Sequence, residues 1–94
     1  MTKADIVAKI SEKLGLEKGD VQATVESFME EVKTSLETGD NVYLRGFGSF
    51  VIKKRAKKTA RNISKNTTII IPEHNIPSFK PAKTFVGSVK SKVK

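Results

Sequence analysis

The stretch RGFGSFVIKKRAKK, Arg45 to Lys58, changes character halfway along its length. Its first half places glycines on both sides of Phe47 and ends at Phe50, whereas the part from Lys53 onward is almost entirely basic. Glycine permits a tight turn or a close backbone approach, and phenylalanine supplies bulk to a core. We therefore predict a turn, followed by a strand that begins in a packed sheet and continues to Lys58 as a basic limb.

The hairpin that follows is the most basic part of the chain. Alternating side chains put the residues of the outgoing limb on two faces: Lys54, Ala56 and Lys58 on one, and Lys53, Arg55 and Lys57 on the other. Neither face is apolar enough to form a core. The stretch TTIIIP, Thr67 to Pro72, is rich in β-branched residues and is typical of a returning strand. We predict a long hairpin that projects into solvent, with its tip near RNISKN, Arg61 to Asn66.

After the hairpin, the chain returns through IPSFKPAK, residues 76–83. Proline has no backbone N–H, so Pro77 and Pro81 are expected to break this strand, and Pro81 is expected to begin a helix. Three apolar residues share one face of that short basic helix: Phe85, Val89 and Val93.

The first forty residues show helical periodicity. Thr2 and Asp5 are spaced as an N-cap and its capping-box partner, and Gly15 suits the end of this helix. A second helix is predicted to begin near residues 18–20 and to end at Gly39. Its apolar stripe comprises Val21, Val25, Phe28, Val32 and Leu36. This stripe is longer than the first helix can cover, which favours a partner chain.

Charge divides the chain into two unlike halves. Residues 1–40 carry five lysines and nine acidic residues, a balance of −4, whereas residues 41–94 carry thirteen Lys and Arg and one acidic residue, Glu73, a balance of +12. The two balances sum to the net charge of +8. Because solubility needs far fewer charges, the excess in the second half indicates a polyanionic partner.

Several classes of protein are disfavoured. The 94 residues suit one small domain, and the absence of cysteine excludes disulfides and thiolate metal sites. No apolar run is long enough to span a bilayer, and the charged N-terminus is unlike a secretory signal, so we expect an intracellular soluble protein. His74 is the single histidine and is interpreted as a surface residue, while Ser49 and Ser78 lack the context of a nucleophile. We predict no catalytic residue, cofactor or metal.

Four features together resemble the HU/integration host factor family of bacterial DNA-bending proteins. They are GFGSF, the basic limb with Arg55, the RN of RNISKN, and the return IPSFKPAK. The resemblance covers the whole chain and implies an α+β fold: two N-terminal helices, a three-stranded antiparallel sheet with a long protruding β-hairpin arm, and a short C-terminal helix. It also implies an intertwined dimer, with residues 1–40 as the helical dimerisation part, 41–81 as the sheet and DNA-binding arm (the arm being about 53–75), and 82–94 as the C-terminal helix.

The arm tip of that family reaches into the DNA minor groove and inserts an apolar wedge between base pairs. The wedge is commonly the proline of an Arg-Asn-Pro stretch, and the matching residues here are Arg61, Asn62 and Ile63. Isoleucine is apolar and stiff at χ1, but it lacks proline's fixed φ. Two glycines usual at the family's tip are replaced by Ala60 and Asn66, of which asparagine tolerates a left-handed turn.

The resemblance and the charge pattern give two sets of expected functional residues. The expected DNA contacts are Lys3, Lys53, Lys54, Arg55, Lys57, Lys58, Arg61, Asn62, Ile63, Lys65, Lys80 and Lys83, with Ile63 as the intercalating wedge. The expected dimer core comprises Phe28, Val32, Leu36, Leu44, Phe47, Phe50 and Phe79.

The function implied is that of a non-enzymatic, histone-like protein of the bacterial cytoplasm and nucleoid. We expect it to bind the minor groove of double-stranded DNA with two β-arms, and to bend and compact DNA with little sequence specificity. Three alternatives stay open: a sequence-specific relative closer to integration host factor, a module that binds RNA or another polyanion, and an enzyme. A homodimer is expected, with a heterodimer of related chains as the alternative, and neither a membrane nor a small-molecule substrate is expected.

Overall fold

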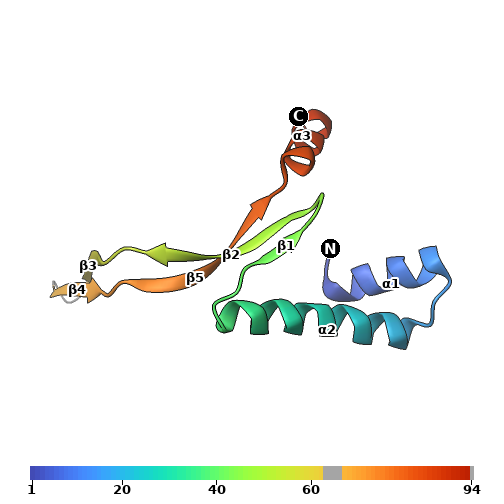
Figure 1. The fold of residues 1–94 in the computed structure, drawn as a ribbon, viewed down its shortest axis with the longest axis horizontal. Helices are drawn as coiled ribbons and strands as arrows, with labels where there is room; N and C mark the ends of the chain where they lie inside the picture. The colour runs from blue at the N-terminus through green and yellow to red at the C-terminus, as the bar shows by residue number, and fades with distance from the viewer. Residues whose placement is uncertain (63–66, 94) are drawn as a thin grey trace. The chain divides into compact units, whose positions relative to one another are not determined.

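The computed structural model describes residues 1–62 and 67–93. The chain forms two compact units, Met1–Ser35 and Leu36–Lys94. In chain order the elements are α1 (Lys3–Leu14), α2 (Lys18–Glu37), β1 (Val42–Leu44), β2 (Gly48–Arg55), β3 (Lys58–Asn62), β4 (Thr67–Ile71), β5 (His74–Pro81) and α3 (Lys83–Lys92). These helices and antiparallel strands confirm the predicted α+β fold (Figure 1).

Both ends of α1 are fixed by the residues that the sequence indicated. The Thr2 hydroxyl accepts a hydrogen bond from the Asp5 backbone N–H, and the Asp5 carboxylate accepts one from the Thr2 N–H at 2.8 Å. The Thr2 N–H, and then the Thr2 hydroxyl, lower the pKa of Asp5. Gly15 ends the helix with φ of 66°, in the left-handed region that glycine favours. The predicted capping box and C-terminal stop are confirmed.

The first unit buries little of the apolar stripe of α2. Val7 and Val21 are its buried hydrophobic side chains, whereas Phe28 is 46% exposed. A rise of about 1.5 Å per residue makes the 12-residue α1 much shorter than the 20-residue α2. The later part of the stripe therefore keeps apolar surface exposed within a single chain.

In the second unit, β2 is the central strand of the sheet β1–β2–β5. Gly46, with φ of 81°, makes the turn between β1 and β2. Gly48 is required for a different reason, because a Cβ there would lie 2.6 Å from the Lys80 carbonyl oxygen and 2.6 Å from the Phe79 ring. The two glycines around Phe47 thus supply a turn and a close approach, the two possibilities that the sequence left open.

The expectation that Pro77 breaks the returning strand is wrong, because β5 continues through it. Pro77 pairs with Ile52 on β2. The Ile52 N–H donates to the Asn41 side chain at 3.0 Å, on the β1 side, and so points away from β5. In an antiparallel ladder, the N–H of the opposite residue then also points away, toward the open edge of the sheet. Proline is tolerated at such a position on an edge strand.

The continuous strand expected from Val51 to Lys58 is also wrong, because the ladder is interrupted at Ala56–Lys57. The pairs Arg55–His74 and Lys58–Ile71 flank the interruption in the same register, which places Lys57 opposite Pro72. Hydrogen-bonded and non-hydrogen-bonded pairs alternate along an antiparallel ladder, and Ile52 belongs to a non-hydrogen-bonded pair. Lys57 therefore falls at a hydrogen-bonded position, where the residue opposite would donate its N–H to the Lys57 carbonyl. Proline has none, so the hydrogen bonds stop here, and β3 and β4 pair with each other beyond it as a separate two-stranded sheet.

Four phenylalanines pack together where the sheet meets α3. Ring centroids are 5.1 Å apart for Phe47 and Phe79, 4.9 Å for Phe50 and Phe79, and 5.6 Å for Phe47 and Phe85. The Ala82 N–H donates to the Phe47 carbonyl at 2.9 Å and joins the start of α3 to the turn before β2. The helix begins at Lys83 and not at Pro81, because Pro81 still pairs with Gly48 in the sheet.

Candidate nucleic-acid interface

The arm, residues 53–75, holds most of the predicted DNA contacts in two antiparallel ladders. Lys53, Lys54 and Arg55 end β2, Lys57 lies in the interruption, and Lys58 begins β3, and all five are exposed. Arg61 and Asn62 are the last residues of β3. Ile63 and Lys65 lie outside the described residues, so the wedge stays a prediction.

The two faces of the arm differ in charge. Lys54 is opposite Asn75, and the Glu73 carboxylate lies 2.6 Å from its ammonium group, so one face carries an acid. We call this the Glu73 face. On the other face, Lys53 is opposite Ile76 and Arg55 is opposite His74. We call this the His74 face; no acidic residue pairs with its β2 cations in the described ladder.

The ion pair between Lys54 and Glu73 is weak. Both side chains are exposed, at 69% and 52% of their surface. Exposed pairs of this kind contribute little to stability, because water screens the charges and two flexible side chains must be held in place. A phosphate can therefore compete with Glu73 for Lys54.

A second group of cations surrounds a hollow beside the turn before β2. The hollow is about 550 Å³ and is lined by Lys80 of β5, Lys83 of α3 and Arg45, among others. The structure thus brings two predicted contacts together and adds Arg45, which the sequence analysis did not select. The available signal for Arg45 was its place directly after the strand that becomes β1. Its proximity to Lys80 could not be predicted, because it depends on the pairing of β1, β2 and β5.

Lys3, the remaining predicted contact, lies in the first unit and forms an ion pair. Its ammonium group is 3.3 Å from Glu26 Oε1, and the Gln22 side-chain amide donates to the same oxygen at 3.0 Å. The Gln22 hydrogen bond, followed by the hydrogen bond and charge of Lys3, lowers the pKa of Glu26. Both side chains are exposed, at 50% and 42% of their surface, so this ion pair is weak as well.

The predicted dimer core keeps considerable surface exposed within one chain. Phe47 is 46% exposed and Phe79 is 37% exposed, although their rings touch. The half-buried members are Val32, Leu36, Leu44 and Phe50. Phe28 is exposed in the first unit, so each unit keeps part of its apolar surface open within one chain. The dimer stays a prediction.

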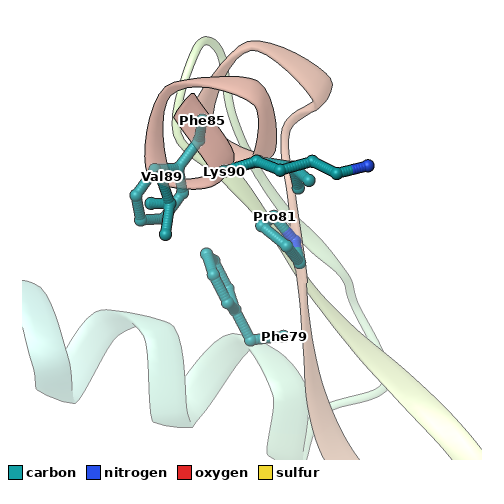
Figure 2. Close-up of a pocket in the computed structure, with 6 residues that line it drawn as sticks. Phe79, Pro81, Phe85, Val89 and Lys90 are labelled. Carbon is teal, nitrogen blue, oxygen red and sulfur yellow. The ribbon is translucent and has the colours of Figure 1, made fainter. Parts of the chain in front are cut away.

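Beside the phenylalanines lies an open apolar hollow of about 470 Å³ (Figure 2). In Figure 2, Phe79 of β5 points toward Phe85 and Val89 of α3, while the Lys90 amine points away. Phe85 was not selected in the sequence analysis, although its ring packs on Phe47. Its spacing with Val89 on α3 was the available signal for this packing. Val93, predicted on the same face, lies just beyond the end of α3.

Within residues 1–62 and 67–93, no group of three or more histidine and acidic side chains is placed to hold a metal ion. In that same part of the chain, no helix has the length and apolar character needed to cross a membrane.

Comparison with protein families gives one match that spans nearly the whole chain. The family described as "Bacterial DNA-binding protein" matches residues 1–90.

Similar proteins carry two kinds of name. Integration host factor subunit alpha of Aliivibrio fischeri is 37% identical over 91 residues, which are 97% of this chain and 93% of that protein. The DNA-binding protein HU of Thermus thermophilus is 38% identical over 90 residues, or 96% of this chain and 93% of that protein.

Solved structures agree with these relatives. An HU–DNA cocrystal structure from Anabaena matches with a TM-score of 0.88 and 30% identity, covering 100% of both chains. HU from Thermotoga maritima matches with a TM-score of 0.64 and 26% identity, again over 100% of both chains.

Proposed function

Because the chain belongs to the family of bacterial DNA-binding proteins that includes HU and integration host factor, we propose that it is a non-enzymatic architectural protein that binds and bends double-stranded DNA. The observation that carries this proposal is the arm, where five exposed cations lie within residues 53–58. Glu73 is the one acidic residue in residues 41–94, and it forms an ion pair with Lys54. The Anabaena relative, whose structure contains DNA, supports duplex DNA as the polyanion.

The arm suits the minor groove. A two-stranded ribbon with cations on both faces can contact the phosphates of both strands that border the groove. Arg55 and Arg61 are best suited to these contacts, since the guanidinium group is planar and weakly hydrated. Ile63 would then enter a base step and kink the duplex. With few groups to read bases, sequence preference is weak, and flexible or nicked DNA is favoured.

The lysines and arginine of the body extend the contact. Lys80, Lys83 and Arg45 around their hollow can hold phosphates on either side of the bend. Lys3 joins them once DNA displaces Glu26. Binding through this many cations releases counterions from the DNA. If roughly six to ten phosphates are contacted, the affinity falls by orders of magnitude as the salt concentration rises.

A second copy of the chain is the proposed occupant of the apolar surface. In the second unit, Phe79, Phe85 and Val89 border an open hollow and Phe47 is 46% exposed; in the first unit, Phe28 is 46% exposed. Exposed aromatic residues grouped in this way mark an interface. A homodimer would place two arms on one duplex, in the bacterial cytoplasm at the nucleoid. Sedimentation of the purified chain tests this, and a stable folded monomer at micromolar concentration would reject it.

A second candidate is a sequence-specific protein that acts with a different partner chain. It is favoured by one observation, the 37% identity to a protein named as a subunit, integration host factor subunit alpha. Footprinting on random and defined DNA separates the two. One site that outcompetes bulk DNA by about a thousandfold, the ratio typical of specific binding, would favour the second candidate.

Fluorescence anisotropy with a labelled duplex tests the proposed function at two salt concentrations. We expect tight binding at low salt, a steep loss at higher salt, and weaker competition by structured RNA than by unlabelled duplex. If the structured RNA competes more strongly than the unlabelled duplex, the partner of this protein would be RNA and not DNA. A nuclease assay with and without divalent metal checks the absence of catalysis, and cleavage of the duplex would contradict it.

A further inference from the structure

A hollow on the arm lies at the interruption of its two ladders. It is about 470 Å³ and is lined by Arg55, Lys57, Lys58 and His74, with the apolar Ile71 and Ile76. We propose that His74 is a phosphate-binding residue of the arm, and that its contact with DNA forms only when the imidazole is protonated. This inference rests on the proposed function, since it names a further contact in the same DNA-binding arm.

The imidazole ring is oriented by one hydrogen bond. Nδ1 of His74 lies 2.9 Å from the carbonyl oxygen of Pro72. A carbonyl oxygen can only accept, so Nδ1 carries the hydrogen. This carbonyl belongs to Pro72, where the ladder is interrupted. The Nδ1–H of His74 donates to it in place of a backbone N–H from the opposite strand. The orientation of the ring therefore follows from the interruption itself.

Because Nδ1 is bonded to the Pro72 carbonyl, Nε2 is the ring nitrogen that can contact DNA. When the ring is neutral, Nε2 is an acceptor and cannot bond to a phosphate oxygen, which also accepts. When the ring is protonated, Nε2 becomes a donor with positive charge, and a phosphate contact is charge-assisted. Imidazole is the side chain whose charge ordinarily changes between about pH 5 and 8.

The neighbours of His74 favour an anion at this place. Arg55 lies directly opposite on β2, and Lys57 and Lys58 border the same hollow. Lys53 is on the same face, two pairs farther along the ladder. The acid closest in sequence, Glu73, is held by Lys54 on the other face.

A phosphate bound beside Arg55 and His74 places a negative charge next to the imidazole, and that charge favours the protonated ring in the complex. By thermodynamic linkage, DNA binding then takes up protons, and lower pH strengthens binding.

Binding of a labelled duplex at fixed ionic strength, at about pH 5.5 and about pH 7.5, tests this proposal. Carboxylates and phosphodiesters keep their charge over this range. Wild-type protein should bind on the order of fivefold more tightly at the lower pH, as expected for one exposed charge contact. His74→Gln should lose this gain and match wild type at the higher pH. His74→Lys should bind tightly at both.

The chain offers a matched control, because His74 and Asn75 are neighbours on opposite faces. The double variant His74→Asn with Asn75→His keeps the composition and the charge, but moves the imidazole to the Glu73 face. It should lose most of the pH dependence. Circular dichroism checks that each variant is folded, which is expected since both residues are exposed.

Two results would overturn the role of His74 alone: wild-type binding that does not change with pH, or a pH dependence that persists unchanged in His74→Gln. Full pH dependence in the exchanged double variant would also overturn it, by showing that net charge suffices. A protein that binds no duplex at either pH would instead reject the proposed function itself.

Discussion

Pro72 stands opposite Lys57 at the one place where the hydrogen bonds of the described arm stop, although the register on both sides is the same. A missing N–H at this position separates the hairpin into a part continuous with the sheet and a part that pairs only with itself. The interruption also frees the Pro72 carbonyl to accept from His74.

Restoring the donor at this position should join the two ladders. Pro72→Ala supplies an N–H that can reach the Lys57 carbonyl, so residues 56–58 and 71–73 should exchange their amide hydrogens more slowly. Hydrogen exchange followed by nuclear magnetic resonance measures this. Pro77→Ala is the control, since its N–H would point to the open edge and should leave exchange on the arm unchanged. Equal effects of the two substitutions would contradict the assigned pattern of hydrogen bonds.

Removal of the acid on the arm should strengthen DNA binding. Glu73→Gln releases Lys54 from its ion pair and adds one unit of net charge to each arm. The slope of log affinity against log salt should steepen by about one for each additional phosphate that the variant neutralises. Glu12→Gln makes the same charge change on α1, outside residues 53–75, and controls for net charge. The account of the Lys54 pair fails if both variants change the slope equally.

Gly48 should tolerate no side chain. In Gly48→Ala the new Cβ would meet the Lys80 backbone and the Phe79 ring at 2.6 Å, which should cost about 1–3 kcal/mol of unfolding free energy. Gly87→Ala in α3 meets nothing within 4 Å and should be neutral or stabilise by up to about 1 kcal/mol. Denaturant unfolding compares the two, and a neutral Gly48→Ala would show that β5 does not approach β2 so closely.

The wedge at the arm tip is open to a test of its own. Ile63→Ala should reduce bending much more than affinity, because the phosphate contacts stay while the apolar lever is removed. Energy transfer between the labelled ends of a duplex reports the bend, and anisotropy reports the affinity. Ile63→Pro, the residue usual in the family, should keep the bend. An unchanged bend in Ile63→Ala would exclude the wedge.

Local signals in the sequence were sufficient for both ends of α1 and for the turn before β2. Thr2, Asp5 and Gly15 act through neighbours within a few residues, so spacing alone placed them. The basic arm was likewise visible, because charge needs no tertiary contact to be recognised. The assignment of individual cations as DNA contacts stays a prediction.

The proline effects could not be predicted from local spacing. Pro77 lies inside a strand and Pro72 interrupts one, and the difference is whether the N–H would face the neighbouring strand. That orientation depends on register, which the sequence did not specify. Arg45 and Phe85 were missed for a related reason, since each joins its cluster only when β5 and α3 return to the turn before β2.

The salt dependence of duplex binding, compared between wild type and a variant with four arm cations replaced, tests the central claim most directly. The variant replaces Lys54, Arg55, Lys58 and Arg61 by alanine. If the arm binds the phosphates, the slope of log affinity against log salt should flatten by about 0.9 for each phosphate that the variant no longer neutralises. A folded variant with a slope as steep as that of wild type would place the phosphate-binding residues elsewhere and contradict the account.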